Sequence, residues 1–223
     1  MAYQSASIYP DSDAGHTLNS QSSWSNARNG TTSGIVTTIA NTNVYTTYSS
    51  VRGSSVYGVA RYFAAFDMSQ GLPYGAAIMS ATANIWYNSI AGADRLVKHN
   101  TTSSLSTTGT FDSCIYGSGD NDEEDMFSYS AQYTPISTSG YTSIALNDQA
   151  LTDIKAVSGT SASNSGMFCL AVIKETDYDF SAPTDGTSHK STMNTDAYTG
   201  TGRDPKIIVM YEKPQPIWFG ATF

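Results

Sequence analysis

Short runs of apolar and β-branched residues alternate with polar, turn-forming segments along most of the chain. The sequence has no fixed-period repeat and no long amphipathic helix, and none of its apolar runs is long enough to span a bilayer. Short β-rich runs divided by Gly, Ser, Asn, Asp and Pro are typical of an all-β sandwich or barrel. We expect strands at the residue ranges 6–10, 56–66, 77–87, 95–99, 141–146, 167–174 and 206–211, and two further strands or a hairpin at 34–48, turning at 41–43.

The run at 56–66 gives the strongest strand signal. Both of its alternating sets of side chains are mostly apolar, which favours a central strand that is covered on both faces. The run at 77–87 alternates instead between an apolar face and a face of Ser, Thr and Asn, so we expect it to be half exposed. Only residues 147–156 predict a helix, with Asn147 or Asp148 as its cap.

The composition never changes to that of a linker between two cores, so we predict one sandwich domain at 1–212 and a tail at 213–223. Prolines make the start of this tail stiff, and its apolar residues are Ile217, Trp218, Phe219 and Phe223. Such side chains are costly to leave in water. The tail therefore either folds back on its own sandwich or inserts into a neighbouring subunit. We favour insertion, which makes these four residues candidates for partner docking.

Two adjacent motifs occur at 61–69 and 72–82. The first reads Arg-Tyr-Phe-Ala-Ala-Phe-Asp-Met-Ser and the second Leu-Pro-Tyr-Gly-Ala-Ala-Ile-Met-Ser-Ala-Thr. In order and spacing they resemble the DNRLRE-type domain, a jelly-roll family related to carbohydrate-binding modules. Weaker matches at 141–147, 164–167 and 199–211 extend the resemblance to roughly residues 20–212. The chain departs from the family at 101–133, which lacks the family's Trp-rich segment.

The resemblance implies a jelly-roll β-sandwich of two antiparallel sheets with one short helix, and a non-catalytic role. Members of the family occur in polysaccharide-degrading systems, in surface proteins and in phage structural proteins. The first residues have neither the basic nor the apolar segment of a signal peptide. We therefore expect a bacteriophage virion protein, such as a capsid decoration, tail or fibre protein, whose partners are other virion proteins or copies of itself. The alternative is a carbohydrate-binding module that recognises host glycans through loop aromatics.

Charged residues are scarce, and acids predominate among them. They make up 13% of the chain, against roughly 25% in an ordinary soluble domain, and the net charge is −8. No cluster of Lys and Arg is visible. This pattern argues against nucleic acid and against an anionic membrane surface as partners.

Few residues suggest catalysis or redox chemistry. His16, His99 and His189 are scattered and lack the spacing of a zinc site. No Gly-x-Ser-x-Gly elbow is present. A carboxylate pair for glycoside hydrolysis stays open from the residues alone, but the resemblance argues against it, so we expect no enzyme. Cys169 lies in an apolar run, where a buried thiol is favoured over a bridge to Cys114.

Structural calcium is the one cofactor for which the sequence offers candidates. Asp120 and Asp122 begin a closely spaced run of acids, which suits the oxygen ligands of Ca²⁺. Asp11 and Asp13 form a second, weaker pair. Blocks of like charge are more often solvated loops, which is the interpretation we favour for the acidic run.

Arg61 lies within an apolar strand and must be paired or reach water. We favour a structural ion pair, with Asp67 and Asp153 as candidate partners, over the alternative of a contact to an anion or a sugar. Asp67 itself is either a ligand for a cation or a cap of the following turn, and we favour the cap.

Aromatic residues are the remaining candidates for recognition, since flat rings stack on sugars and dominate protein interfaces. Trp24, Tyr74 and Trp86 are the candidate glycan-binding residues. For Trp24, which stands in a polar segment, we favour a packing role at the end of the sandwich.

Overall fold

A computed structural model describes residues 3–11, 14–29, 34–36, 40–99, 126–138, 140–158, 166–184, 186, 188–196, 200 and 202–213. The elements are β1 (Tyr3–Ile8), β2 (Gly15–Gln21), α1 (Trp24–Asn29), β3 (Gly34–Val36), β4 (Asn41–Val51), β5 (Ser54–Asp67), the 3₁₀ turn η1 (Met68–Gln70), β6 (Ala77–Ser89), β7 (Asp94–Lys98), β8 (Tyr141–Ala145), α2 (Asp148–Val157), β9 (Met167–Lys174), α3 (Glu175–Tyr178), β10 (Ser188–Asn194) and β11 (Lys206–Glu212). The all-β class is confirmed.

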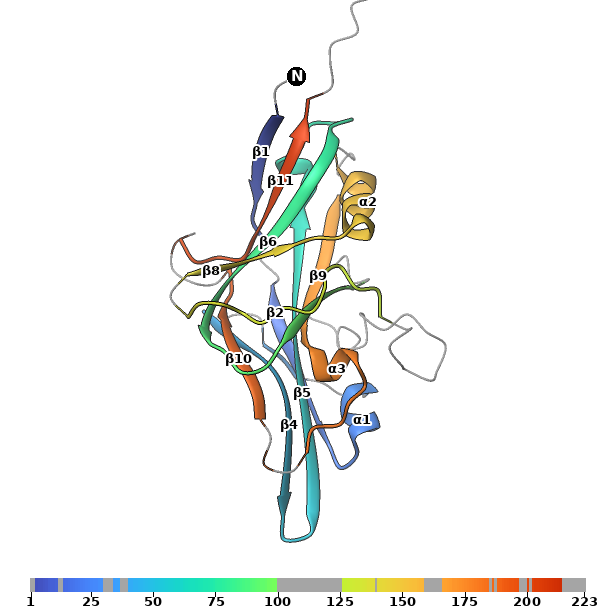
Figure 1. Cartoon of the computed structure of the whole chain (residues 1–223), viewed down its shortest axis with the longest axis vertical. Coiled ribbons are helices and arrows are strands. Elements are labelled where there is room, and N and C mark those ends of the chain that lie inside the picture. Colours follow the sequence, from blue (N-terminus) through green and yellow to red (C-terminus); the bar gives the residue numbers. More distant parts are fainter. Residues whose placement is uncertain are drawn as a thin grey trace, which may run out of the picture.

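The described strands form one curled antiparallel sheet. Its main path runs β1-β11-β6-β10-β4-β5-β2-β3, with β8 paired to β6, β9 paired to β5 and β7 paired to β9. In Figure 1 the curl carries β1, β11 and β6 across the half that contains β5 and β9. Strand β10 connects the two halves, because it pairs with β4 along its length and with β6 at one end.

The main core lies between these two halves of the sheet. Tyr62 and Phe66 of β5 and Leu170 of β9 enter it from one side, and Ile85 of β6 and Val209 of β11 from the other. Each is at most 2% exposed. Every second residue of a strand points to the same face, so the apolar alternation of the sequence builds this core directly.

The opposite face of β5 and β9 is covered as well. Phe63, Val97, Met126, Ala171 and Ile173 form a second buried cluster there. Strand β5 is thus buried on both faces over most of its length, as the sequence predicts.

Strand β6 is half exposed, as expected, but its alternation breaks near its start. Ala81, Ala83 and Ile85 are buried as predicted, whereas Met79 is 49% exposed. The pairing with β11 skips Met79, because Met210 pairs with Ser80 and the next residue pairs beyond Met79. This β-bulge places an extra residue in β6 and turns the Met79 side chain outward.

Helix α2 is the predicted helix, and Asn147 is its cap. The side-chain oxygen of Asn147 accepts a hydrogen bond from the Ala150 amide at 3.0 Å. Ala150 and Ile154 form the buried face of the helix.

The residues 34–48 contain two strands, β3 and β4, as one of the two alternatives predicted, whereas the hairpin at 41–43 is wrong. Strand β4 runs unbroken from Asn41 and pairs with β5 and β10, while β3 pairs with β2. The first strand ends at Ile8 rather than continuing to residue 10. Strands β2 and β10 and helices α1 and α3 were not predicted, because their residues are mostly polar and have no apolar period.

Candidate functional site

Strands β4 and β5 form a two-stranded ribbon that projects beyond the rest of the sheet (Figure 1). Strand β10 pairs with β4 only as far as Thr47, and β2 pairs with β5 only from Tyr57. Beyond these residues, no other described strand pairs with either edge of the ribbon. The turn consists of Arg52 and Gly53, with φ of 53° and 82°, and two positive φ values are the signature of a tight hairpin turn. The ribbon therefore offers two backbone edges for pairing.

The side chains of this ribbon carry little charge. Tyr48 and Tyr57 lie opposite each other with ring centroids 4.6 Å apart, and the Tyr48 hydroxyl is hydrogen-bonded to Ser55 at 3.0 Å. Val56 is 45% exposed, and Arg52 is the one charged residue between Tyr48 and Tyr57. Natural edge strands are usually protected by Lys, Pro or bulges. This ribbon has none of them between Tyr48 and Tyr57, so its edges are suited to pairing with another chain.

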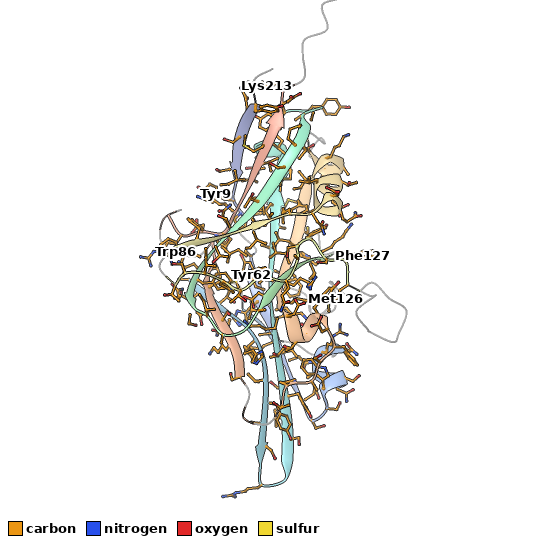
Figure 2. The ribbon with its side chains drawn as sticks, in the orientation of Figure 1. Tyr9, Tyr62, Trp86, Met126, Phe127 and Lys213 are labelled. Carbon is orange, nitrogen blue, oxygen red and sulfur yellow. The ribbon has the colours of Figure 1, made fainter. Side chains whose placement is uncertain are left out.

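A second surface combines aromatic and cationic side chains near β6 and β8. Trp86 and Tyr141 meet edge to face, with ring centroids 5.5 Å apart. The Arg203 guanidinium lies 4.9 Å from the centre of the Trp86 ring, and the Lys206 ammonium 4.5 Å from that of Tyr141. Figure 2 shows Trp86 at the side of the molecule, below Tyr9. Half-buried rings with cations on their faces are suited to recognition.

Tyr141 is held within this surface. Its hydroxyl donates to the Asp204 carbonyl oxygen at 3.0 Å. Burial raises the pKa of Tyr141, and the nearby Tyr9 and Asp204 raise it further. The phenol is therefore protonated at neutral pH.

The other two candidate glycan-binding residues lie elsewhere. Tyr74 is 81% exposed on the loop before β6 and borders a hollow of about 480 Å³ with Lys155 and Ser158. Trp24 is only 8% exposed, and its indole N–H donates to the Phe180 carbonyl oxygen at 3.2 Å. This placement agrees with the packing role that we favoured for Trp24. The structure does not gather the three aromatics into one platform.

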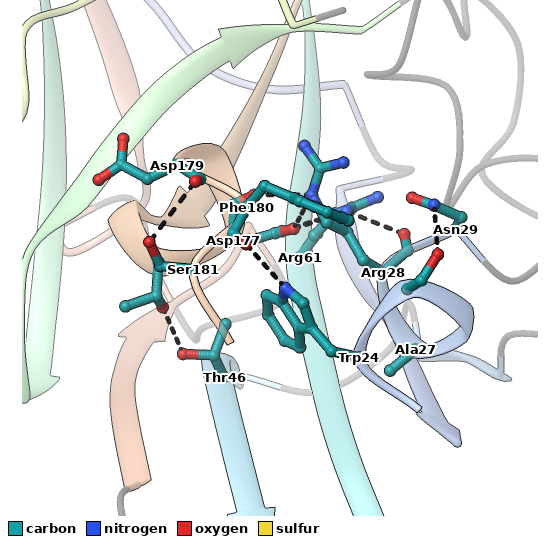
Figure 3. Close-up of polar contacts among 12 residues, drawn as sticks. Trp24, Ala27, Arg28, Asn29, Thr46, Arg61, Asp177, Asp179, Phe180 and Ser181 are labelled. Carbon is teal, nitrogen blue, oxygen red and sulfur yellow. Dashed lines mark hydrogen bonds and ion pairs between the residues drawn. The ribbon is translucent and has the colours of Figure 1, made fainter. Parts of the chain in front are cut away.

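Figure 3 shows the buried ion cluster beside Trp24. Arg61 binds both carboxylate oxygens of Asp177, at 2.7 and 2.8 Å, and also donates to the Arg28 carbonyl oxygen at 3.0 Å. Arg28 lies 3.3 Å from the same carboxylate and donates to the Asp177 carbonyl oxygen at 2.8 Å. The side chains of all three residues are at most 1% exposed. The expected ion pair exists, but its acid is Asp177 and not Asp67 or Asp153.

The cluster joins α1, β5 and α3 at one point. No sequence signal marked Asp177, which is 116 positions from Arg61, as its partner. The only clue was general: a buried arginine in an apolar strand requires an acid from the segment that covers it.

Asp67 and Asp153 have other partners. Asp67 accepts from the Ser69 amide at 3.0 Å and from Gln70 at 2.7 Å. Partial burial alone would raise the pKa of Asp67, but these hydrogen bonds lower it. Asp153 lies 2.9 Å from Lys98. The cap interpretation of Asp67 is confirmed.

The calcium candidates are only partly described. Asp11 lines a hollow of about 260 Å³ together with Asp67. Asp13, Asp120 and Asp122 lie outside the described residues. Within the described part, no group of three or more His, Cys, Asp or Glu could hold a metal. Calcium binding stays a prediction.

A hollow of about 330 Å³ beside α2 contains His99 and Cys169. Burial lowers the pKa of His99 to about 4 and raises the pKa of Cys169 to about 12. Neither group has the pKa of a general base or a thiolate nucleophile near neutral pH. Cys114 lies outside the described residues.

The docking residues predicted in the tail, Ile217, Trp218, Phe219 and Phe223, also lie outside the described residues, which end at Lys213. Among the described helices, none is long and apolar enough to cross a membrane.

No protein-family model matches this chain, and no curated protein matches it. The resemblance to the DNRLRE-type domain stays a prediction.

Proposed function

We propose that this chain is a non-catalytic structural protein that docks to neighbouring subunits, as a surface component of a bacteriophage particle. The curled sheet is, in this proposal, a jelly-roll sandwich. Support for the sandwich comes from the main core, to which β5 and β9 contribute one layer and β6 and β11 the other. Support for the virion comes from the scarcity of charge and from the motifs at 61–82.

The projecting ribbon of β4 and β5 is the observation that carries this proposal. An isolated two-stranded ribbon is marginal in water, yet the strands continue from Ser49 to Val56 with unpaired edges, and their side chains outside the turn are those of Ser and Val. A partner strand that adds to an edge gains main-chain hydrogen bonds. The ribbon is therefore a docking element, and the tail, with its four apolar residues, is a second one.

Light scattering on three forms of the protein tests this proposal. The first is the full chain, the second ends after Lys213, and the third replaces residues 49–56 by Asn-Gly, which closes the ribbon at the facing pair Tyr48 and Tyr57. We expect the full chain to assemble and the shortened ribbon to give a folded monomer. A full chain that is monomeric at high concentration contradicts the proposal.

A carbohydrate-binding module is the second candidate function. The Trp86 and Tyr141 rings, with Arg203 and Lys206 beside them, favour it, because sugars stack on partly exposed rings. Binding to a glycan array that is lost in Trp86→Ala but kept in Trp24→Phe would support this function over docking alone.

A further inference from the structure

Lys174 and Asp94 form a buried pair beneath the edge of the sheet. Asp94 is the first residue of β7 and Lys174 the last of β9, and they lie opposite each other in the strand register. The Lys174 Nζ atom is 2.6 Å from Asp94 Oδ1, and both side chains are 0% exposed. No other Lys–Asp contact in the described part is as deeply buried.

The geometry around Nζ differs from that of an ordinary ion pair. Nζ donates to the Ala91 carbonyl oxygen at 2.7 Å and to the Ser191 hydroxyl at 2.6 Å. The third direction around Nζ faces the Asp94 carboxyl group, which it contacts at hydrogen-bond distance. In the neutral amine, the two N–H groups would keep these acceptors and the lone pair would face the carboxyl group.

Burial favours the uncharged form of both groups. It raises the pKa of Asp94, although the Lys174 charge opposes the shift. It lowers the pKa of Lys174, although Asp94 opposes that shift. Desolvation thus favours the neutral acid and the neutral amine over the two ions.

A proton donor lies beside the carboxyl group. Burial, and then the charge of Asp94, raise the pKa of Tyr87 well above its ordinary value, so the phenol stays protonated. Its hydroxyl is hydrogen-bonded to that of Tyr133 at 2.9 Å. A phenol in this position can stabilise negative charge that develops on the Asp94 oxygens.

We infer that Lys174 and Asp94 form an intramolecular amide bond in the folded protein. The Nζ lone pair attacks Cγ of the neutral carboxylic acid and gives a tetrahedral intermediate. One proton passes from nitrogen to the departing oxygen, the Cγ–O bond breaks, and one water molecule leaves. Amine and acid thereby become an amide and water, and no oxidant or other co-reactant is required. The contact geometry supplies the proximity that such a step needs.

The bond would join β7 to β9 covalently and close a loop from residue 94 to residue 174. Cross-links that close long loops restrict the unfolded chain and stabilise the fold. This inference is independent of the proposed docking function.

Intact-mass measurement of the denatured full chain tests the inference. The expected mass is one water below that of the sequence, and trypsin should not cleave after Lys174. Tandem mass spectrometry should then find the peptides around residues 94 and 174 joined. Asp94→Asn should give the same final mass as the wild type, because the amide then forms with loss of ammonia.

The chain also provides a matched control. Lys98 and Asp153 lie 2.9 Å apart, but their side chains are 34% and 20% exposed, so Asp153→Ala should keep the loss of water. Lys174→Gln should abolish it. A full chain with its complete sequence mass and normal cleavage after Lys174 overturns the inference. A loss of water that persists in Lys174→Gln, or that occurs without the joined peptide, overturns it equally.

Discussion

The two parts of strand β5 have opposite surroundings. From Gly58 to Phe66 its side chains are buried, apart from the half-buried Ala65. From Ser54 to Tyr57 the same strand is exposed or half-buried and pairs only with β4 until β2 begins. The buried part contributes to both cores and, through Val59, to a third cluster with Trp24 and Ala27, against which Tyr57 of the ribbon packs. One continuous strand therefore stabilises the fold at one end and is exposed for contact at the other.

Truncating one apolar side chain in each part of β5 should show the largest difference in the free energy of unfolding. Phe66 is 1% exposed and Val56 is 45% exposed. We expect Phe66→Ala to lower the free energy of unfolding by about 3–5 kcal/mol and Val56→Ala to change it by less than about 0.5 kcal/mol. Urea unfolding measures both, and equal effects would show that the ribbon belongs to the core.

Removing the charge of Asp177 should cause the second-largest loss in the free energy of unfolding. Asp177→Asn leaves Arg28 and Arg61 buried without their carboxylate, and breaking such a contact costs about 3–5 kcal/mol. Glu175 is the control, because its pair with Arg95 is more exposed. Glu175→Gln should cost less than Asp177→Asn, because the Arg95–Glu175 pair is partly open to water and the Asp177 cluster is not. The same unfolding assay applies, and a larger loss in Glu175→Gln would refute the role of the buried cluster.

Acid should destabilise the buried part through His99. Its ring Nε2 contacts the Ala64 carbonyl oxygen of β5 at 3.1 Å, and its pKa in the folded state is about 4 against an ordinary 6.5. Because the unfolded chain binds the proton more readily, stability is complete above pH 6.5 and falls as the pH drops toward 4. The contribution is about 3 kcal/mol. Urea unfolding of the wild type and His99→Gln at pH 7 and near pH 4 measures it, and identical pH dependence in the two proteins would contradict the assignment.

The smallest effect should come from the cap at the end of β5. Asp67→Ala removes the hydrogen bonds to Ser69 and Gln70 and should cost about 1 kcal/mol. Because hydrogen bonding lowers the pKa of Asp67, its contribution is present at neutral pH and disappears as the pH falls through the lowered pKa. The difference between wild type and variant should therefore vanish in acid, and a constant difference would exclude the cap as its source.

The sequence predicted those elements whose residues repeat with a clear apolar period. Strands β5, β6 and β9 and helix α2 were found because burial alone defines them. Strand β10 was missed because its Ser, His, Lys and Thr residues show no apolar face; its position depends on backbone pairing with β4 and β6. The exposure of Met79 was not predicted, because it results from a bulge that depends on the pairing with β11.

Most of the candidate sites depend on contacts between distant segments. Trp86 was named from the sequence, but Tyr141, Arg203 and Lys206 join it only through the pairing of β6 with β8 and β11. Lys174 carried a local signal, since it ends an apolar run. Its neighbour on β7, Asp94, could not be predicted from that run, because the two residues meet only through strand pairing.

Hydrogen exchange along the ribbon tests the central claim most directly. The backbone amides of residues 48–56 should exchange fast in a dilute monomer and slowly in the assembled protein, while the amides of β5 at residues 59–66 stay protected in both states. A protein that assembles while the ribbon amides exchange as fast as in the monomer would contradict docking through β4 and β5.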